Sequence, residues 1–148
     1  MLNRRLLPHL RDKEAVKMNR VIQWISAAAA AACGFLWGQM DGLLYALIAF
    51  MILDYVSGVL VAIAQRELSS QVGFKGIAKK VCILMLVAVG HLLDEHVLGG
   101  GAVCRMAVAG FYLANEGISI LENAGELGLP LPKKLVSVLK QLKEKEEK

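Results

Sequence analysis

The sequence has few of the residues on which soluble enzymes and disulfide-linked domains depend. It contains three cysteines, three prolines and three histidines among 148 residues, and the cysteines form no C-x-x-C pair. Cys33, Cys82 and Cys104 lie inside apolar segments, so we expect small buried hydrophobes there rather than disulfides or metal ligands. G-x-S-x-G, P-loop and dinucleotide-binding fingerprints are also missing from the sequence. It therefore predicts no enzyme, no cofactor and no metal site.

Long stretches of the chain also lack charged residues. The composition is 56% hydrophobic with a mean hydropathy of +0.51, which is too apolar for a soluble domain of this length. Leu43 to Ala64 carries 22 residues with a single charge, Asp54, at its centre. About 20 apolar residues cover the ~30 Å hydrocarbon core of a bilayer, so this segment predicts a transmembrane helix. An ionised aspartate there costs roughly 2.5–3.5 kcal/mol, and we expect Asp54 to meet a partner helix or water.

The basic residues alternate with acidic connections along the chain. Six lie between Met1 and Arg20, four between Gln65 and Lys80, and six after Glu122, whereas the connections 38–42 and 94–101 carry acidic charges only. The positive-inside rule then puts both termini and the 65–80 loop in the cytoplasm. This dispersed pattern lacks the aromatic-interleaved basic patch of a nucleic-acid binder, so nucleic acid is not an expected partner.

Four crossings satisfy this charge pattern. We expect them at about 21–37, 43–64, 81–98 and 102–121, as two hairpins joined by the basic loop. The third is the weakest, because its uninterrupted apolar part, 81–93, has only 13 residues and such a segment can be re-entrant. A topology with three crossings therefore stays open.

The predicted fold class is an all-α integral membrane protein with three regions. Residues 1–20 form a basic cytoplasmic extension, 21–121 the transmembrane helices, and 122–148 a cytoplasmic tail rich in proline and lysine. An amphipathic helix is expected in the tail, with one apolar stripe made of Leu135, Val138, Leu139 and Leu142. Its lysines suit contact with the anionic inner leaflet, so the lipid bilayer itself is an expected partner. Pairing with another helix and a solvated tail stay open as alternatives.

Small residues recur at helical spacing in three of the predicted crossings. In the first crossing they are Ala30, Gly34 and Gly38, four residues apart, which favours close approach of another backbone. Four further small residues are predicted packing positions in the second and fourth crossings: Gly58, Ala62, Gly110 and Ala114. They predict that helices of this chain pack closely, including with a second copy.

Polar residues form stripes on the second and fourth predicted crossings. The predicted polar or lesion-lining residues are Asp54, Ser57, Arg105, Tyr112, Glu116 and Ser119. Arg105 and Glu116 are eleven residues apart, which at 100° per residue leaves them within about 20° on one helix face. Two interpretations stay open: the stripes wall a water-filled path, or they satisfy one another inside a closed bundle.

Three separated strings in the sequence match a known family in order. They are DYVSG at 54–58, LSSQVGFKGIAKK at 68–80, and NEGISILENAG at 115–125 followed by GLPLP at 128–132. Together they resemble the phage lysis and toxin-secretion holin family of phages and prophages of Gram-positive bacteria, over roughly residues 21–142.

The resemblance implies a small multi-pass protein of the bacterial host cytoplasmic membrane. It would form homo-oligomers and open lesions at a set time. These would release endolysin, with which direct contact is not needed, or toxin in some relatives. Two alternatives remain at this point: a small transporter that uses Asp54 to bind a cation, and an antiholin of the same family. Met18 is a possible second start of translation, which would remove a net +3 of charge from the N-terminus.

Overall fold

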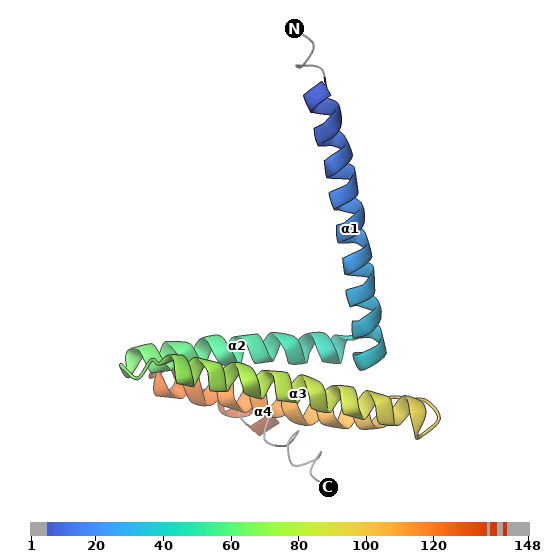
Figure 1. Cartoon of the computed structure of the whole chain (residues 1–148). Helices are drawn as coiled ribbons and strands as arrows, with labels where there is room; N and C mark the ends of the chain where they lie inside the picture. Colours follow the sequence, from blue (N-terminus) through green and yellow to red (C-terminus); the bar gives the residue numbers. More distant parts are fainter. Residues whose placement is uncertain (1–5, 136, 139–140, 142–148) are drawn as a thin grey trace. The chain divides into compact units, whose positions relative to one another are not determined.

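The structure is a computed structural model that describes residues 6–135, 137–138 and 141, with side chains from residue 16 on. Four helices follow one another: α1 (Leu6–Trp37), α2 (Gly42–Ala64), α3 (Ser70–His96) and α4 (Val103–Glu126) (Figure 1). The described residues contain no strand, so the predicted all-α class is confirmed. The chain divides into two compact units, residues 1–38 and 39–148.

The first unit is the single helix α1. It is continuous across the predicted boundary at residue 20, and its part from Val16 to Trp37 is long and apolar enough to cross a membrane. Ala30 and Gly34 are exposed, and a Cβ added at Gly34 would meet nothing within 4 Å. The helix ends because Gly38 takes a left-handed φ of 71°, which glycine adopts without strain.

In the second unit, α2 coincides closely with the second predicted crossing. The Asp41 side chain caps the helix by accepting the Leu44 backbone N–H at 2.9 Å. The helix has 23 residues and the highest mean hydropathy of the candidate membrane spans, 2.3. A continuous apolar run between two turn segments has therefore produced a helix of full spanning length.

Helix α3 is longer than the third predicted crossing. The Ser69 hydroxyl accepts the Val72 backbone N–H at 3.2 Å, so the helix starts at Ser70 rather than near Val81. The prediction of a basic loop over 65–80 was therefore wrong in its extent, because only 65–69 lie between α2 and α3. With 27 residues, α3 is long and apolar enough to span a membrane.

Helix α4 lies against both α2 and α3. Three described helices, α1, α2 and α3, meet the length and hydropathy of a membrane span, and α4 does not. In Figure 1 α2, α3 and α4 run side by side, with α4 packed on both α2 and α3 while these two touch each other little. The buried apolar side chains come from all three helices and include Leu47, Ile83, Val87, Ala109 and Ala114.

The backbones of α3 and α4 approach each other closely at Gly90. A Cβ at this position would lie 3.0 Å from the Arg105 Cα and 3.1 Å from its backbone nitrogen, so only glycine fits without a shift. Glycine here allows the first turn of α4 to lie directly on α3.

The tail after α4 is described in part. Residues 133–135, 137–138 and 141 are helical, and Leu135 and Val138 are exposed. The other two members of the predicted apolar stripe, Leu139 and Leu142, lie outside the described residues. The amphipathic tail therefore stays a prediction.

Candidate functional site

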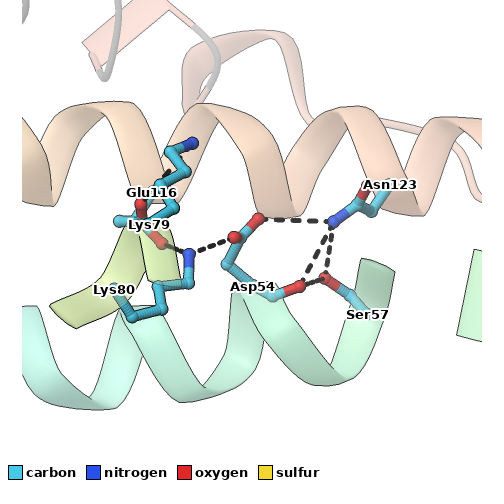
Figure 2. A network of polar contacts seen from close by, with 6 residues as sticks. All are labelled: Asp54, Ser57, Lys79, Lys80, Glu116 and Asn123. Carbon is cyan, nitrogen blue, oxygen red and sulfur yellow. Dashed lines mark hydrogen bonds and ion pairs between the residues drawn. The ribbon is translucent and has the colours of Figure 1, made fainter. Parts of the chain in front are cut away.

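A cluster of charged side chains lies inside the bundle of α2, α3 and α4. The ammonium group of Lys80, on α3, is paired with both the Asp54 carboxylate of α2 and the Glu116 carboxylate of α4 (Figure 2). One lysine thus joins all three helices through ion pairs. We call Asp54, Lys80 and Glu116 the buried triad.

Two polar side chains extend the triad along the α2–α4 contact. The Asn123 amide nitrogen donates to the Ser57 hydroxyl at 2.9 Å and lies 3.4 Å from the Asp54 Oδ1 atom (Figure 2). Ser57 in turn donates to the Asp54 backbone carbonyl at 3.0 Å. A Cβ at Gly58 would come within 3.7 Å of the Asn123 amide, so a small residue there accommodates this neighbour. The second and fourth helices are therefore hydrogen-bonded at the level of the triad.

The triad is almost removed from solvent. The Glu116 side chain is 0% exposed, and those of Asp54 and Lys80 are each 12% exposed. Charges in so apolar a setting are tolerated only when they are paired, because the desolvation cost of an unpaired ion is several kcal/mol. Lys80 is therefore the residue that permits two carboxylates to lie inside this bundle.

A second set of polar contacts lies at the end of the bundle where α2 and α4 begin. The Arg105 guanidinium pairs with Asp41 and donates to the Gln39 carbonyl at 3.1 Å, joining α4 to the start of α2. The pKa of Asp41 lies below its ordinary value, mainly because its carboxylate accepts the Leu44 backbone N–H and also because Arg105 lies beside it. Asp41 thus caps one helix and anchors another.

Asp94 caps a helix to which it does not belong. It is on α3, is 1% exposed, and accepts the backbone N–H groups of Cys104 at 2.9 Å and Arg105 at 2.8 Å. The residue at the start of α4, Ala102, makes no side-chain cap of its own. A carboxylate at the positive end of a helix satisfies orphan donors and the helix dipole together. The α3–α4 hairpin is therefore locked at this end.

At the opposite end of the bundle the Gln65 amide donates to the Glu126 carboxylate at 2.9 Å. Because Arg105 meets Asp41 at the start of both helices, α2 and α4 run parallel along their full length. The triad lies between these two end contacts.

The structure brings together some of the predicted site residues. Asp54, Ser57 and Glu116 meet at the triad, and Ser119 lines a cavity of about 180 Å³ beside it together with Asn123. Gly58 and Ala62 are on the same helix, and Ala62 is buried, as is Ala114 of α4. The polar stripes of the second and fourth predicted crossings therefore face each other.

Other predicted residues lie elsewhere. Arg105 joins Asp41 at the end of the bundle, and the Tyr112 ring meets Phe111 edge-on at 5.2 Å. Gly110 is half-buried on α4, and Ala30, Gly34 and Gly38 belong to the first unit. The packing role of these small residues stays a prediction.

Sequence reasoning missed Lys80 and Asp94 as site residues. Lys80 was assigned to a cytoplasmic basic loop, and only the Ser69 cap reveals that the helix already includes it. Gly76 and Lys80 are four residues apart, so on a helix they lie on the same face. A small residue beside Lys80 was the available signal that this face packs inward. Asp94 was grouped with an exposed acidic connection, whereas it is buried at the α3–α4 turn.

Comparison with known proteins identifies relatives over most of the chain. A family model described as the bacteriophage holin family matches residues 31–144. A probable holin of Bacillus phage phi105 is 31% identical over 101 residues, which cover 68% of this chain and 73% of that protein.

Two uncharacterised bacterial proteins are more similar. One, of Halalkalibacterium halodurans, is 40% identical over 135 residues, covering 88% of this chain and 100% of that protein. The other, of Listeria innocua, is 48% identical over 109 residues, covering 74% of this chain and 77% of that protein. No solved structure matches the chain.

Replacing Lys80 with methionine should destabilise the bundle by roughly 3–5 kcal/mol, because it leaves two buried carboxylates without their counter-charge. Lys79→Met is the matched control: its side chain is 60% exposed, so its loss should change stability little. Denaturant unfolding of the purified chain in detergent, followed by circular dichroism, measures both. Equal stability of the two variants would contradict a structural role for the triad.

Proposed function

The chain belongs to the bacteriophage holin family, and we propose that it gathers with copies of itself in the cytoplasmic membrane of a bacterial host and opens lesions there. The lesions release endolysin, which the chain need not contact directly, or toxin, and the host lyses at a set time. Membership of this family points to a membrane protein without enzymatic activity.

The observation that carries the proposal is the inverted polarity of the α2–α4 bundle. Apolar side chains of α2 are about half exposed, among them Ile52, Leu53, Val56, Leu60 and Ile63, while the charges of the triad are inside. An apolar surface suits lipid, and intramembrane charges that are hidden in helix contacts are available to face water after a rearrangement. This is the arrangement that a closed subunit of a lesion requires.

The triad itself supplies a driving force for the rearrangement. In the closed bundle the triad retains its desolvation cost, which pairing offsets only in part. When subunits cluster and their α2–α4 contacts separate, Asp54, Lys80 and Glu116 face water and this cost disappears. A polar stripe then lines the lesion, and the apolar face keeps its contact with lipid.

Self-association is proposed to begin at α1. Its described side chains between residues 16 and 35 are exposed, and Ala30 and Gly34 leave a shallow surface against which a backbone can pack. Transmembrane helices associate through small residues of this kind, since van der Waals contact drives their packing. A second copy of this chain is therefore the proposed partner.

The transporter alternative is less well supported by the site. A transported cation would have to bind between the carboxylates of Asp54 and Glu116, and the Lys80 ammonium group already occupies this position. The antiholin alternative is distinguished by expression alone, because an antiholin leaves the membrane potential and viability intact.

We further propose four crossings with both termini in the cytoplasm. Contacts at both ends of α4 pair it with α2 along its length, so α4 crosses wherever α2 does. Its lower hydropathy is compatible with crossing because its polar residues meet α2 and α3 rather than lipid. The basic residues before and after the helices support the cytoplasmic side for both termini.

The topology is tested by single cysteines in a variant from which Cys33, Cys82 and Cys104 have been removed. A membrane-impermeant maleimide should label Gln39→Cys and Leu98→Cys in intact cells, since both connections lie outside. Glu67→Cys and Lys133→Cys should react only after permeabilisation. Labelling of Lys133→Cys in intact cells would contradict the four crossings.

The function is tested by inducible expression with membrane potential and viable counts followed together. Wild type should depolarise the membrane abruptly after a delay, and Asp54→Leu should insert normally without causing lysis. In this variant one of the three buried polar side chains is replaced by an apolar one, so opening exposes fewer polar groups to water and gains less. Glu95→Leu, which removes an exposed carboxylate, is the control that should lyse on time. An unchanged lysis time for Asp54→Leu would refute the role of the triad, and steady growth of wild type would refute the holin proposal.

A further inference from the structure

The buried triad has an unequal number of positive and negative charges. Among the described residues, the charged groups that face Glu116 are Asp54 from α2 and Lys80 and Lys79 from α3. Two carboxylates therefore share one buried ammonium group, that of Lys80. If both carboxylates are ionised, an uncompensated negative charge stays inside an apolar bundle.

Lys79 does not supply the missing positive charge. Its ammonium nitrogen lies 4.0 Å from the Glu116 Oε1 atom, at the outer limit of an ion pair, and its side chain is 60% exposed (Figure 2). Water screens an ammonium group so placed, and its attraction for a buried carboxylate is weak. The charge balance must come from the triad itself.

The two carboxylates differ in what surrounds them. Asp54 is 12% exposed and has both Lys80 and the Asn123 amide as neighbours. Glu116 is fully buried, and its Oε1 atom has no hydrogen-bond partner among the described residues. An ionised carboxylate oxygen without a donor is far costlier in such a site than a protonated one. A proton is therefore held more favourably at Glu116 than at Asp54.

We propose that Glu116 holds a proton in the closed bundle, so that the triad is a proton-binding site made of one ionised aspartate, one lysine and one neutral glutamic acid. The cavity of about 180 Å³ beside the triad is lined by Asp54, Lys80 and the exposed Lys79 and not by Glu116, so the proton reaches solvent by way of the Asp54 carboxylate or the Lys80 ammonium group. The proton on Glu116 is therefore exchangeable with solvent. The opposite charges of Asp54 and Lys80 balance each other.

The proton site makes opening of the bundle depend on pH, a consequence that rests on the proposed function. Once the bundle opens and Glu116 faces water, its carboxyl group is ionised at neutral pH and the proton is released. Closing therefore takes up one proton, and the ratio of closed to open bundles changes by up to about tenfold for each pH unit near neutrality. Higher pH favours the open form.

The proton is measured directly by infrared spectroscopy of the purified full chain in lipid vesicles at neutral pH. Wild type should show the carbonyl stretch of a protonated carboxylic acid, which shifts in D₂O, and Glu116→Gln should lack it. Asp54→Asn should lack it too, because Glu116 then ionises against Lys80. Lys79→Met should keep the band. Circular dichroism establishes that each variant is folded, and the near-isosteric Asn and Gln changes keep the cavity volume.

Absence of the band from wild type, or its persistence in Glu116→Gln, would overturn the inference. A band that survives in Asp54→Asn would also overturn it, since the charge balance would then not decide the protonation of Glu116. These outcomes are independent of lysis: a chain that lyses cells without showing the band refutes the proton site alone. A chain that shows the band without depolarising cells refutes the lesion proposal alone.

Discussion

The ion pairs of Lys80 with Asp54 and Glu116 are the interaction on which the α2–α4 bundle depends. Through them the Lys80 side chain of α3 reaches both α2 and α4, and they allow two carboxylates to lie in an otherwise apolar interior. Without Lys80 neither carboxylate has a buried counter-charge. The polar face of α4 can then be accommodated only by moving it toward water.

The position of α4 follows from this constraint. Its hydropathy falls short of that of the candidate membrane spans α1, α2 and α3, and it packs against both α2 and α3. Contacts at Asp41, Asp94 and Gln65 fix its two ends, and Gly90 permits its first turn to approach α3. Polar contacts therefore join the helices at both ends of the bundle, and the buried triad lies between them. Separation of α2 from α4 exposes the triad.

Much of this arrangement was predictable from the sequence, and particular residues show why the rest was not. Helical periodicity identified the faces that carry Asp54, Ser57 and Glu116, and the single charge in a 22-residue apolar run marked Asp54. Periodicity does not reveal which helices meet or in what register. Lys80 was therefore assigned to a cytoplasmic basic loop, and Asp94 to an exposed acidic turn. Both are defined by contacts with residues far away in the sequence.

Separation of α2 from α4 is the step that opens the lesion in the proposed function. It is tested most directly by a disulfide between Ser57→Cys and Asn123→Cys, whose native side chains are 2.9 Å apart, in a chain without its native cysteines. Vesicles that hold the oxidised protein should retain an enclosed dye, and a reductant should start its release. Release at the same rate with the disulfide intact would contradict the claim.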